Sequence, residues 1–141
     1  MRYLGLDLGT KTLGIAISDR LGTISNPYKT IKYSSKEELV KEIKKIIDEE
    51  NVQAIALGFP KNMDNSIGDA GTRSIEFKKL LEKNIDVPIE LIDERLSTVE
   101  AEKYLLDADM SRKKRKDIID AVAASVILNT YIRMKGNDKN E

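Results

Sequence analysis

Acidic side chains occur at three places in the sequence where the predicted strands and helices do not account for a carboxylate. Asp7 lies within a predicted strand that otherwise reads as core, and Asp120 lies on the apolar stripe of a predicted helix. The third place is the pair Asp93 and Glu94, which follows a buried strand at the point where parallel strands collect ligands. Aspartate is depleted from strands, and a carboxylate that faces a core requires a partner such as a metal ion. These four residues are therefore the candidate catalytic residues.

The same residues also have ordinary structural interpretations. Asp7 could cap the turn that follows its strand, and Asp93 and Glu94 could belong to a polar loop that complements the dipole of the next helix. Asp120 could lie at the edge of its stripe and reach water.

The composition limits the chemistry that remains available. The chain contains no histidine and no cysteine, which removes the usual general base and the usual zinc ligands. Carboxylate oxygens alone suit Mg²⁺ or Mn²⁺, ions that keep bound waters and contact phosphate oxygens. Because such ions can generate the nucleophile of a phosphodiester displacement, the pattern favours a metal-dependent nuclease, whichever ion it uses.

The segments that must position these carboxylates alternate between strand and helix patterns. Strands are predicted at residues 3–8, 14–19, 28–33, 53–57 and 88–92, and helices at residues 36–51, across 75–81, at 97–108 and at 117–133. Three strands followed by helix, strand, helix and strand imply an α/β fold with a mixed sheet, antiparallel at one side and parallel at the other. Helices are expected to cover that sheet.

The last predicted helix carries the feature that would bring the carboxylates together. Asp120 shares a face with Ala123 and Ala124, three and four positions further on. Small residues across 121–125 allow this helix to approach the sheet closely. We therefore expect Asp120 to lie near Asp7.

Length and charge restrict the architecture and the partners. With 141 residues, 40% of them hydrophobic, the chain is expected to form one domain over residues 1–135, followed by a flexible tail at 136–141. The absence of an apolar run long enough to span a membrane, and of cysteine, predicts a cytoplasmic protein. The formal net charge is zero, so a nucleic-acid partner would need a local basic patch.

Such a patch is present just before the last predicted helix. Five consecutive cations separate the end of the preceding predicted helix from the start of the last one, although a run of this kind is often only a solvated turn. The predicted nucleic-acid contacts are Lys11, Lys61, Arg73, Arg95, Arg112, Lys113, Lys114, Arg115 and Lys116. Few aromatic residues are available for base stacking, so structure or end recognition is expected instead of sequence reading.

Four motifs together resemble one protein family. They are MRYLGLDLGTKTLGIAISD at the start, the GFPKNMDNS loop, DERLSTVEA in the middle and SRKKRKDIIDAVAASVIL near the end. In this order, and spread over nearly the whole chain, they resemble the YqgF family, also called RuvX, of pre-16S ribosomal RNA nucleases and Holliday junction resolvases. Each motif alone would be a weak signal.

The resemblance implies a fold, a site and a substrate. The fold would be RNase H-like, with a five-stranded sheet of order 3-2-1-4-5 flanked by helices. The site would consist of Asp7, Asp120 and the acidic residue of the DER motif, Glu94, with Asp93 as the alternative. The substrate would be the 5′ end of pre-16S ribosomal RNA, with ribosomal particles as possible partners, or four-way DNA junctions.

Two other classes of function remain open from the sequence. The first strand is similar to the phosphate-binding opening of sugar kinases and actin-like ATPases, which close two such domains around a nucleotide, whereas this chain provides one unless it forms a homodimer. A non-catalytic RNA-binding assembly module would keep the carboxylates for structure. Residue patterns do not choose between a monomer, which suits RNA trimming, and a homodimer, which suits symmetric junctions.

Overall fold

The computed structural model describes residues 1–60, 67–93 and 112–139, with the side chains of residues 112–118 and 137–139 not described. Three sequence predictions therefore lie outside the described residues: the helix at 97–108, and the contacts assigned to Lys61 and Arg95. Glu94 lies outside them as well.

Five strands form one mixed sheet whose order is β3-β2-β1-β4-β5, as the family resemblance implied. β1 pairs antiparallel with β2 and parallel with β4, while β3 and β5 form the two edges. The strands are β1 (Arg2–Leu8), β2 (Thr12–Ser18), β3 (Ser25–Lys32), β4 (Val52–Phe59) and β5 (Ile89–Asp93).

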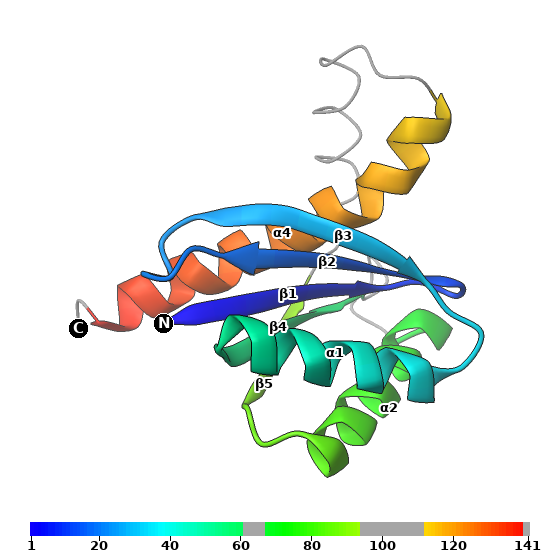
Figure 1. Ribbon diagram of the computed structural model, residues 1–141, viewed down its shortest axis with the longest axis horizontal. Helices are drawn as coiled ribbons and strands as arrows, with labels where there is room; N and C mark the ends of the chain where they lie inside the picture. The colour runs from blue at the N-terminus through cyan, green and yellow to red at the C-terminus, as the bar shows by residue number, and fades with distance from the viewer. Residues whose placement is uncertain (61–66, 94–111, 140–141) are drawn as a thin grey trace.

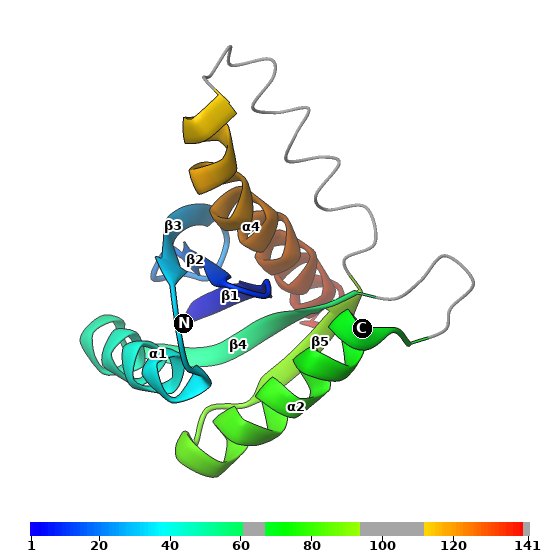
Figure 2. The same ribbon diagram turned by 90° about the vertical axis from the view of Figure 1, so that its right-hand side faces the viewer.

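Helices cover both faces of this sheet. The described helices are α1 (Lys36–Glu50), α2 (Asp69–Asn84) and α4 (Arg112–Lys139). Figure 2 shows α1 and α2 on one face and α4 on the other, and α4 lies across β1, β2 and β3. The predicted covering of the sheet by helices is confirmed, and Figure 1 shows the start of β1 and the end of α4 at the same side of the molecule.

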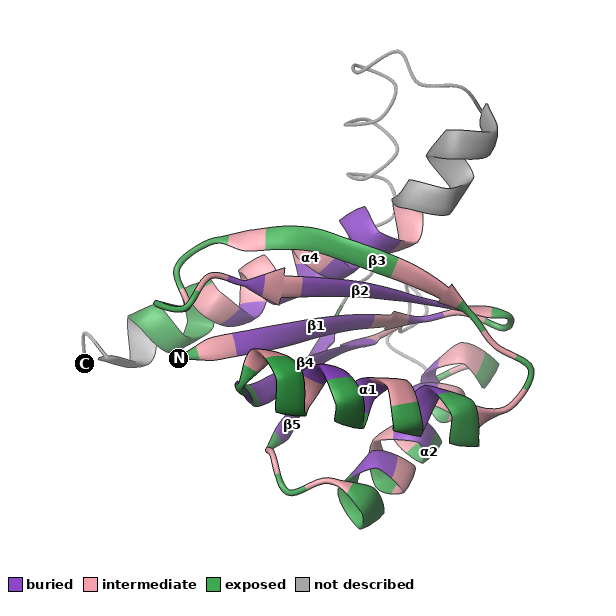
Figure 3. Ribbon diagram, in the orientation of Figure 1, coloured by how far each residue is buried: buried purple, intermediate pink, exposed green. Residues whose placement is uncertain are grey.

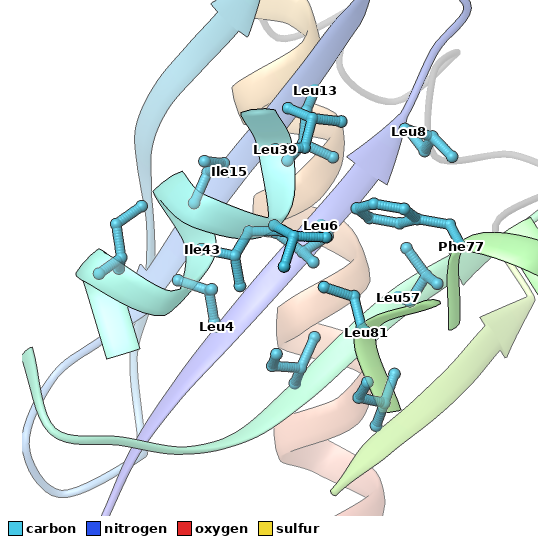
Figure 4. Packing of buried hydrophobic residues seen from close by; sticks show 14 of the residues in the cluster. Leu4, Leu6, Leu8, Leu13, Ile15, Leu39, Ile43, Leu57, Phe77 and Leu81 are labelled. Carbon is cyan, nitrogen blue, oxygen red and sulfur yellow. The ribbon is translucent and has the colours of Figure 1, made fainter. Parts of the chain in front are cut away.

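The alternation of side chains along β1 supplies both layers of the core. Leu4, Leu6 and Leu8 point toward α1 and α2, where they pack in one large apolar cluster around Phe77 (Figure 4). Tyr3 points the other way into a second cluster beneath α4. Figure 3 shows β1 and β2 as largely buried strands and β3 as an exposed edge. β1 is therefore the central strand, and every other residue of β1 faces α4.

The last helix is longer than the sequence predicted. α4 begins at Arg112 and ends at Lys139, five residues before and six residues after the predicted limits of 117–133. Arginine and lysine are good helix formers, so the basic run continues the helix in place of forming a turn before it. The predicted start of this helix at residue 117 is thus wrong, because the basic run lies within α4. No helix within the described ranges is long and apolar enough to cross a membrane.

Candidate active site

Asp7 lies one residue before the end of β1, on the face of the sheet that α4 covers. The alternation that buries Leu6 and Leu8 against α1 and α2 places Asp7 on the same side as Tyr3, beneath α4. The residue is half-buried. In the antiparallel ladder its neighbour on β2 is Gly14, so these two residues are separated by the short spacing of a cross-strand pair.

Gly14 is the point at which α4 approaches the sheet most tightly around Asp120. A Cβ atom on Gly14 would lie 2.0 Å from the carbonyl oxygen of Asp120 and 2.9 Å from its Cβ. A second glycine, Gly5 on β1, makes the same kind of contact, since its Cβ would lie 2.6 Å from the carbonyl oxygen of Ala124. Both glycines are places where only the absence of a side chain permits the contact.

These contacts place Asp120 beside Asp7. Asp7 pairs with Gly14, and Gly14 touches the backbone of Asp120. The stripe that was predicted to face the sheet is buried, with Ala123 2% exposed and Ala124 fully buried, whereas Asp120 is half-buried. The structure therefore confirms that α4 brings Asp120 toward the end of β1.

One side chain holds the Asp120 carboxylate directly. The hydroxyl of Thr12, at the start of β2, donates a 2.8 Å hydrogen bond to Oδ2 of Asp120. Thr12 and Gly14 are two positions apart on one strand and so face the same side of the sheet. Sequence reasoning missed Thr12.

Asp93 lies at the same end of the sheet as Asp7, where the parallel strands β1 and β5 finish, but on the other face. It is the last residue of β5 and pairs with Phe59 at the end of β4. The alternation along β5 places Asp93 with Ile89 and Leu91, which pack toward α1 and α2, whereas Ile92 packs beneath α4. Asp93 is exposed. Of the two acidic residues in this pair, the described one is therefore on the face away from Asp7.

The turn between β1 and β2 borders the candidate site, and hydrogen bonds from Tyr33, a residue outside the turn, hold it in place. Within the turn, the amide of Gly9 donates to the carbonyl of Thr12 at 2.8 Å. Tyr33 then contributes two bonds, since its hydroxyl donates to the Gly9 carbonyl at 2.5 Å and its amide donates to the Lys11 carbonyl at 3.1 Å. Tyr33 is a further residue that sequence reasoning missed.

Two predicted nucleic-acid contacts lie near this turn. Lys11 is exposed within the turn itself. Arg73, on α2, acts electrostatically on Tyr33: burial raises the pKa of the Tyr33 hydroxyl, and the positive charge of Arg73 opposes that shift. Nε of Arg73 is buried without a hydrogen-bond partner among the described residues. One positive charge therefore lies in the turn, and a second acts on the tyrosine that bonds to it.

The basic run occupies the first turns of α4. In Figure 1 this end of the helix projects beyond the sheet, and the first turn contains no acidic residue. Five consecutive helical positions cover more than a full turn of the helix. The run therefore lies on a projecting helix end. Its members from Lys113 to Lys116 precede Asp120 by seven to four residues in the chain.

The donor set fits a hard divalent cation but is not complete within the described residues. Asp7 and Asp120 offer carboxylate oxygens, the ligands that Mg²⁺ and Mn²⁺ prefer. Over residues 1–60, 67–93 and 119–136, no three Asp or Glu side chains lie close enough together to hold a metal ion. A third acidic ligand would have to come from outside this part of the chain.

Comparison with known proteins identifies the family. The family model RuvX, described as Holliday junction resolvase, matches residues 1–134. A relative from Geobacillus sp. (strain WCH70), named "Putative pre-16S rRNA nuclease", is 50% identical over 96% of this chain and 99% of its own length. A relative of the same name from Clostridium botulinum (strain Alaska E43 / Type E3) is 48% identical over 94% of this chain and 96% of its own length.

Solved structures show the same fold at low sequence identity. RuvC of T. thermophilus, in a complex with a Holliday junction substrate, superposes with a TM-score of 0.60 at 14% identity, covering 96% of both chains. The Fowlpox virus resolvase, also with junction DNA, gives a TM-score of 0.60 at 12% identity, covering 96% of this chain and 99% of its own. The fold is therefore RNase H-like, as predicted, and the family match over nearly the full length shows that the chain belongs to the RuvX family.

Proposed function

We propose that this protein is a divalent-metal-dependent nuclease that cleaves phosphodiester bonds in the 5′-end processing of pre-16S ribosomal RNA. The observation that carries the proposal is the convergence of Asp7 and Asp120 through Gly14, at the end of the central strand. The names of its close relatives support the choice of RNA as the substrate. Such a role would place the protein in the cytoplasm, where precursor ribosomal particles are assembled.

Asp7, Asp120 and Glu94 would hold the cation. Of the two acidic candidates, Asp93 faces α1 and α2, away from Asp7, and the family pattern assigns the role to Glu94. When bound, Mg²⁺ or Mn²⁺ would supply an activated water and would neutralise charge on the phosphate. Because the chain has no histidine, the side chains here serve to hold and orient charge.

Basic groups near the site would bind the phosphate backbone. Lys11 lies within the β1–β2 turn and Arg73 acts on Tyr33, which bonds to that turn, while the basic run at the start of α4 extends away from the sheet. Contacts of this type position a nucleic acid without reading its sequence. The net charge of zero confines this attraction to one region of the surface.

A cleavage assay on a panel of substrates tests the proposal. Wild-type protein would be incubated with pre-16S 5′ ends, unrelated single-stranded RNA and four-way DNA junctions, with Mg²⁺, with Mn²⁺ and with a chelator. Asp7→Asn and Asp120→Asn would be assayed beside it, because each keeps the side-chain shape and removes the charge. We expect metal-dependent cleavage of the pre-16S ends and at least about a hundredfold loss in either variant, as for the removal of a group that stabilises transition-state charge.

The same assay separates the alternatives. Preferred cleavage of junctions would replace the RNA assignment with junction resolution, the activity for which the family is described. Binding of RNA without cleavage under any metal condition would show a non-catalytic assembly module. Cleavage that survives both substitutions would refute the proposed site.

The basic run has its own test, with a matched control on the opposite face. Lys114→Gln combined with Lys116→Gln should lower RNA affinity and flatten its salt dependence, with the slope falling by about 0.7 to 0.9 for each phosphate that is no longer neutralised. Lys44→Gln with Lys45→Gln, two exposed positions on α1, should leave affinity and slope unchanged. Binding measured across a salt series gives both values, and equal effects of the two pairs would contradict a focal patch.

A further inference from the structure

The hydroxyl of Thr12 is the hydrogen-bond partner of the Asp120 carboxylate. It donates to Oδ2 at 2.8 Å, and an ionised carboxylate can only accept, so the direction of this bond is fixed. Throughout the described part of the chain, no other hydrogen bond or ion pair to the Asp120 side chain is present. One oxygen is thus engaged by Thr12, and none of the described residues bonds to Oδ1.

Thr12 is itself held in place by the backbone. Its carbonyl accepts the 2.8 Å bond from the amide of Gly9, and its residue opens the ladder between β2 and β3 by pairing with Lys32. A β-branched side chain has few χ1 rotamers. The hydroxyl is therefore presented to Asp120 from a rigid position at the end of the turn.

The contact between Gly14 and Asp120 fixes the other end of the same interaction. Because Gly14 contacts the backbone of Asp120, the aspartate has little freedom to move along or away from β2. The close contact of Gly14 with the Asp120 backbone and the bond from Thr12 to Oδ2 together restrict the orientation of the carboxylate. Loss of a group that orients a metal ligand commonly weakens metal affinity by about 10- to 100-fold.

We propose that Thr12 is a positioning residue that orients the Asp120 carboxylate, engaging Oδ2 and leaving Oδ1 for a divalent cation shared with Asp7. This inference rests on the proposed function, since it assumes that Asp120 binds the cation. It assigns Thr12 no contact with substrate and no part in proton transfer.

The same hydrogen bond could act only as a structural latch, that is, as a bond that holds β2 against α4 without affecting the metal site. The test therefore needs a matched control variant. Ser25 provides one: its hydroxyl bonds to the Ser125 carbonyl at 2.8 Å and lies 2.9 Å from the Ser125 hydroxyl. Ser25→Ala removes a strand-to-α4 hydroxyl bond elsewhere along the same helix. If Thr12 acted only as a latch, the loss of either bond would have the same consequences.

The experiment measures Mn²⁺ binding to the full chain by calorimetry, with no nucleic acid present. The variants are Thr12→Val, which is nearly isosteric, Thr12→Ala, Thr12→Ser, Ser25→Ala and Asp120→Asn, and the midpoint of unfolding without metal is recorded for each. We expect the Mn²⁺ dissociation constant to rise about tenfold or more in Thr12→Val and Thr12→Ala, and to stay within about threefold of wild type in Thr12→Ser. Ser25→Ala should lower the unfolding midpoint without changing that constant.

The outcomes separate this inference from the proposed function. If Asp120→Asn abolishes Mn²⁺ binding but Thr12→Val and Thr12→Ala bind as tightly as wild type, the role of Thr12 is refuted and the metal site stands. If Ser25→Ala weakens Mn²⁺ binding as much as Thr12→Ala, the bond is only a latch and the inference fails. If Asp120→Asn leaves Mn²⁺ binding unchanged, or wild type binds none, both the inference and the proposed function fail.

Discussion

Gly14 contacts Asp120 so closely that a Cβ atom on the glycine would lie 2.3 Å from the Asp120 carbonyl carbon. Because Gly14 also pairs with Asp7 across the β1–β2 ladder, one residue without a side chain is the common neighbour of the two acidic residues of the candidate site. The separation between strand and helix is set here by backbone atoms, which cannot rotate away as a flexible side chain could. The site therefore depends on a position that carries no functional group.

Gly14→Ala should damage both folding and the site. The added methyl group would force α4 away from β2, and overpacking of this kind costs about 1–3 kcal/mol of unfolding free energy. Displacement of α4 would also separate Asp120 from Asp7 and weaken Mn²⁺ binding. Urea unfolding followed by circular dichroism, with Mn²⁺ calorimetry on the same sample, measures both effects.

Gly136→Ala is the matched control for that substitution. Gly136 lies in α4, and nothing is found within 4 Å of the position its Cβ would occupy. Alanine is the better helix former, so this variant should gain about 0.5–1 kcal/mol or remain unchanged. Equal stability of Gly14→Ala and wild type would show that the helix does not sit so closely on β2.

Tyr33→Phe should loosen the turn between β1 and β2. The substitution removes the bond from the Tyr33 hydroxyl to the Gly9 carbonyl, at a cost of about 1 kcal/mol for a hydrogen bond of this type. Because burial raises the pKa of Tyr33, the hydroxyl remains protonated and able to donate throughout the neutral range. Hydrogen exchange at the Gly9 amide should become faster.

Tyr28→Phe tests whether that effect is local. Tyr28 lies on β3, with 40% of its surface exposed, and no hydrogen bond of its hydroxyl is found in the described ranges. Exchange at the Gly9 amide should match wild type in this variant. The same exchange rate in all three proteins would mean that Tyr33 does not hold the turn.

Asp19 should make stability depend on pH at the acid end of the range. Bonds from the Ile24 amide, the Thr23 hydroxyl and the Thr23 amide lower its pKa from 3.8 to about 2. Since the folded-state pKa is the lower one, this stabilisation is fully present above about pH 3.8 and is lost as pH falls through about 2.

The comparison is between wild type and Asp19→Asn. The difference in unfolding free energy should be largest near neutral pH and should shrink steadily as the pH falls from 3.8 toward 2. Asp86→Asn, at an exposed position between α2 and β5, corrects for the general loss of one negative charge. A difference that is constant with pH would contradict the assigned role of the Asp19 carboxylate.

The sequence predicted the fold because its signals are local and agree with one another. Alternating leucines in β1 and the apolar spacing of α1 each define one buried face, which predicts a mixed sheet covered by helices. The order of the strands was implied by the resemblance of the four motifs to one family, and the structure has that order. The limits of α4 were predicted less well. A basic run can lie in a solvated turn or at a helix end, and the structure shows that in this chain it lies at the start of a helix.

The candidate site was predicted in part. Asp7 and Asp120 could be identified because each carries a charge where apolar residues were expected. Thr12 and Tyr33 could not, because a threonine at a strand end and a tyrosine beyond one have no unusual spacing, and their partners are distant in sequence. Gly14 did carry a usable signal, since a glycine inside a strand often marks a close backbone approach.

The most direct test of the metal site is the position of the ion itself. Crystals of the wild-type protein grown with Mn²⁺ would be measured at a wavelength where manganese scatters anomalously. We predict an anomalous peak between the carboxylates of Asp7 and Asp120, within direct coordination distance of an oxygen of each, which is about 2.0–2.1 Å for Mg²⁺ in oxygen sites. A peak bound by other residues, or no peak at this position under saturating Mn²⁺, would contradict the shared site.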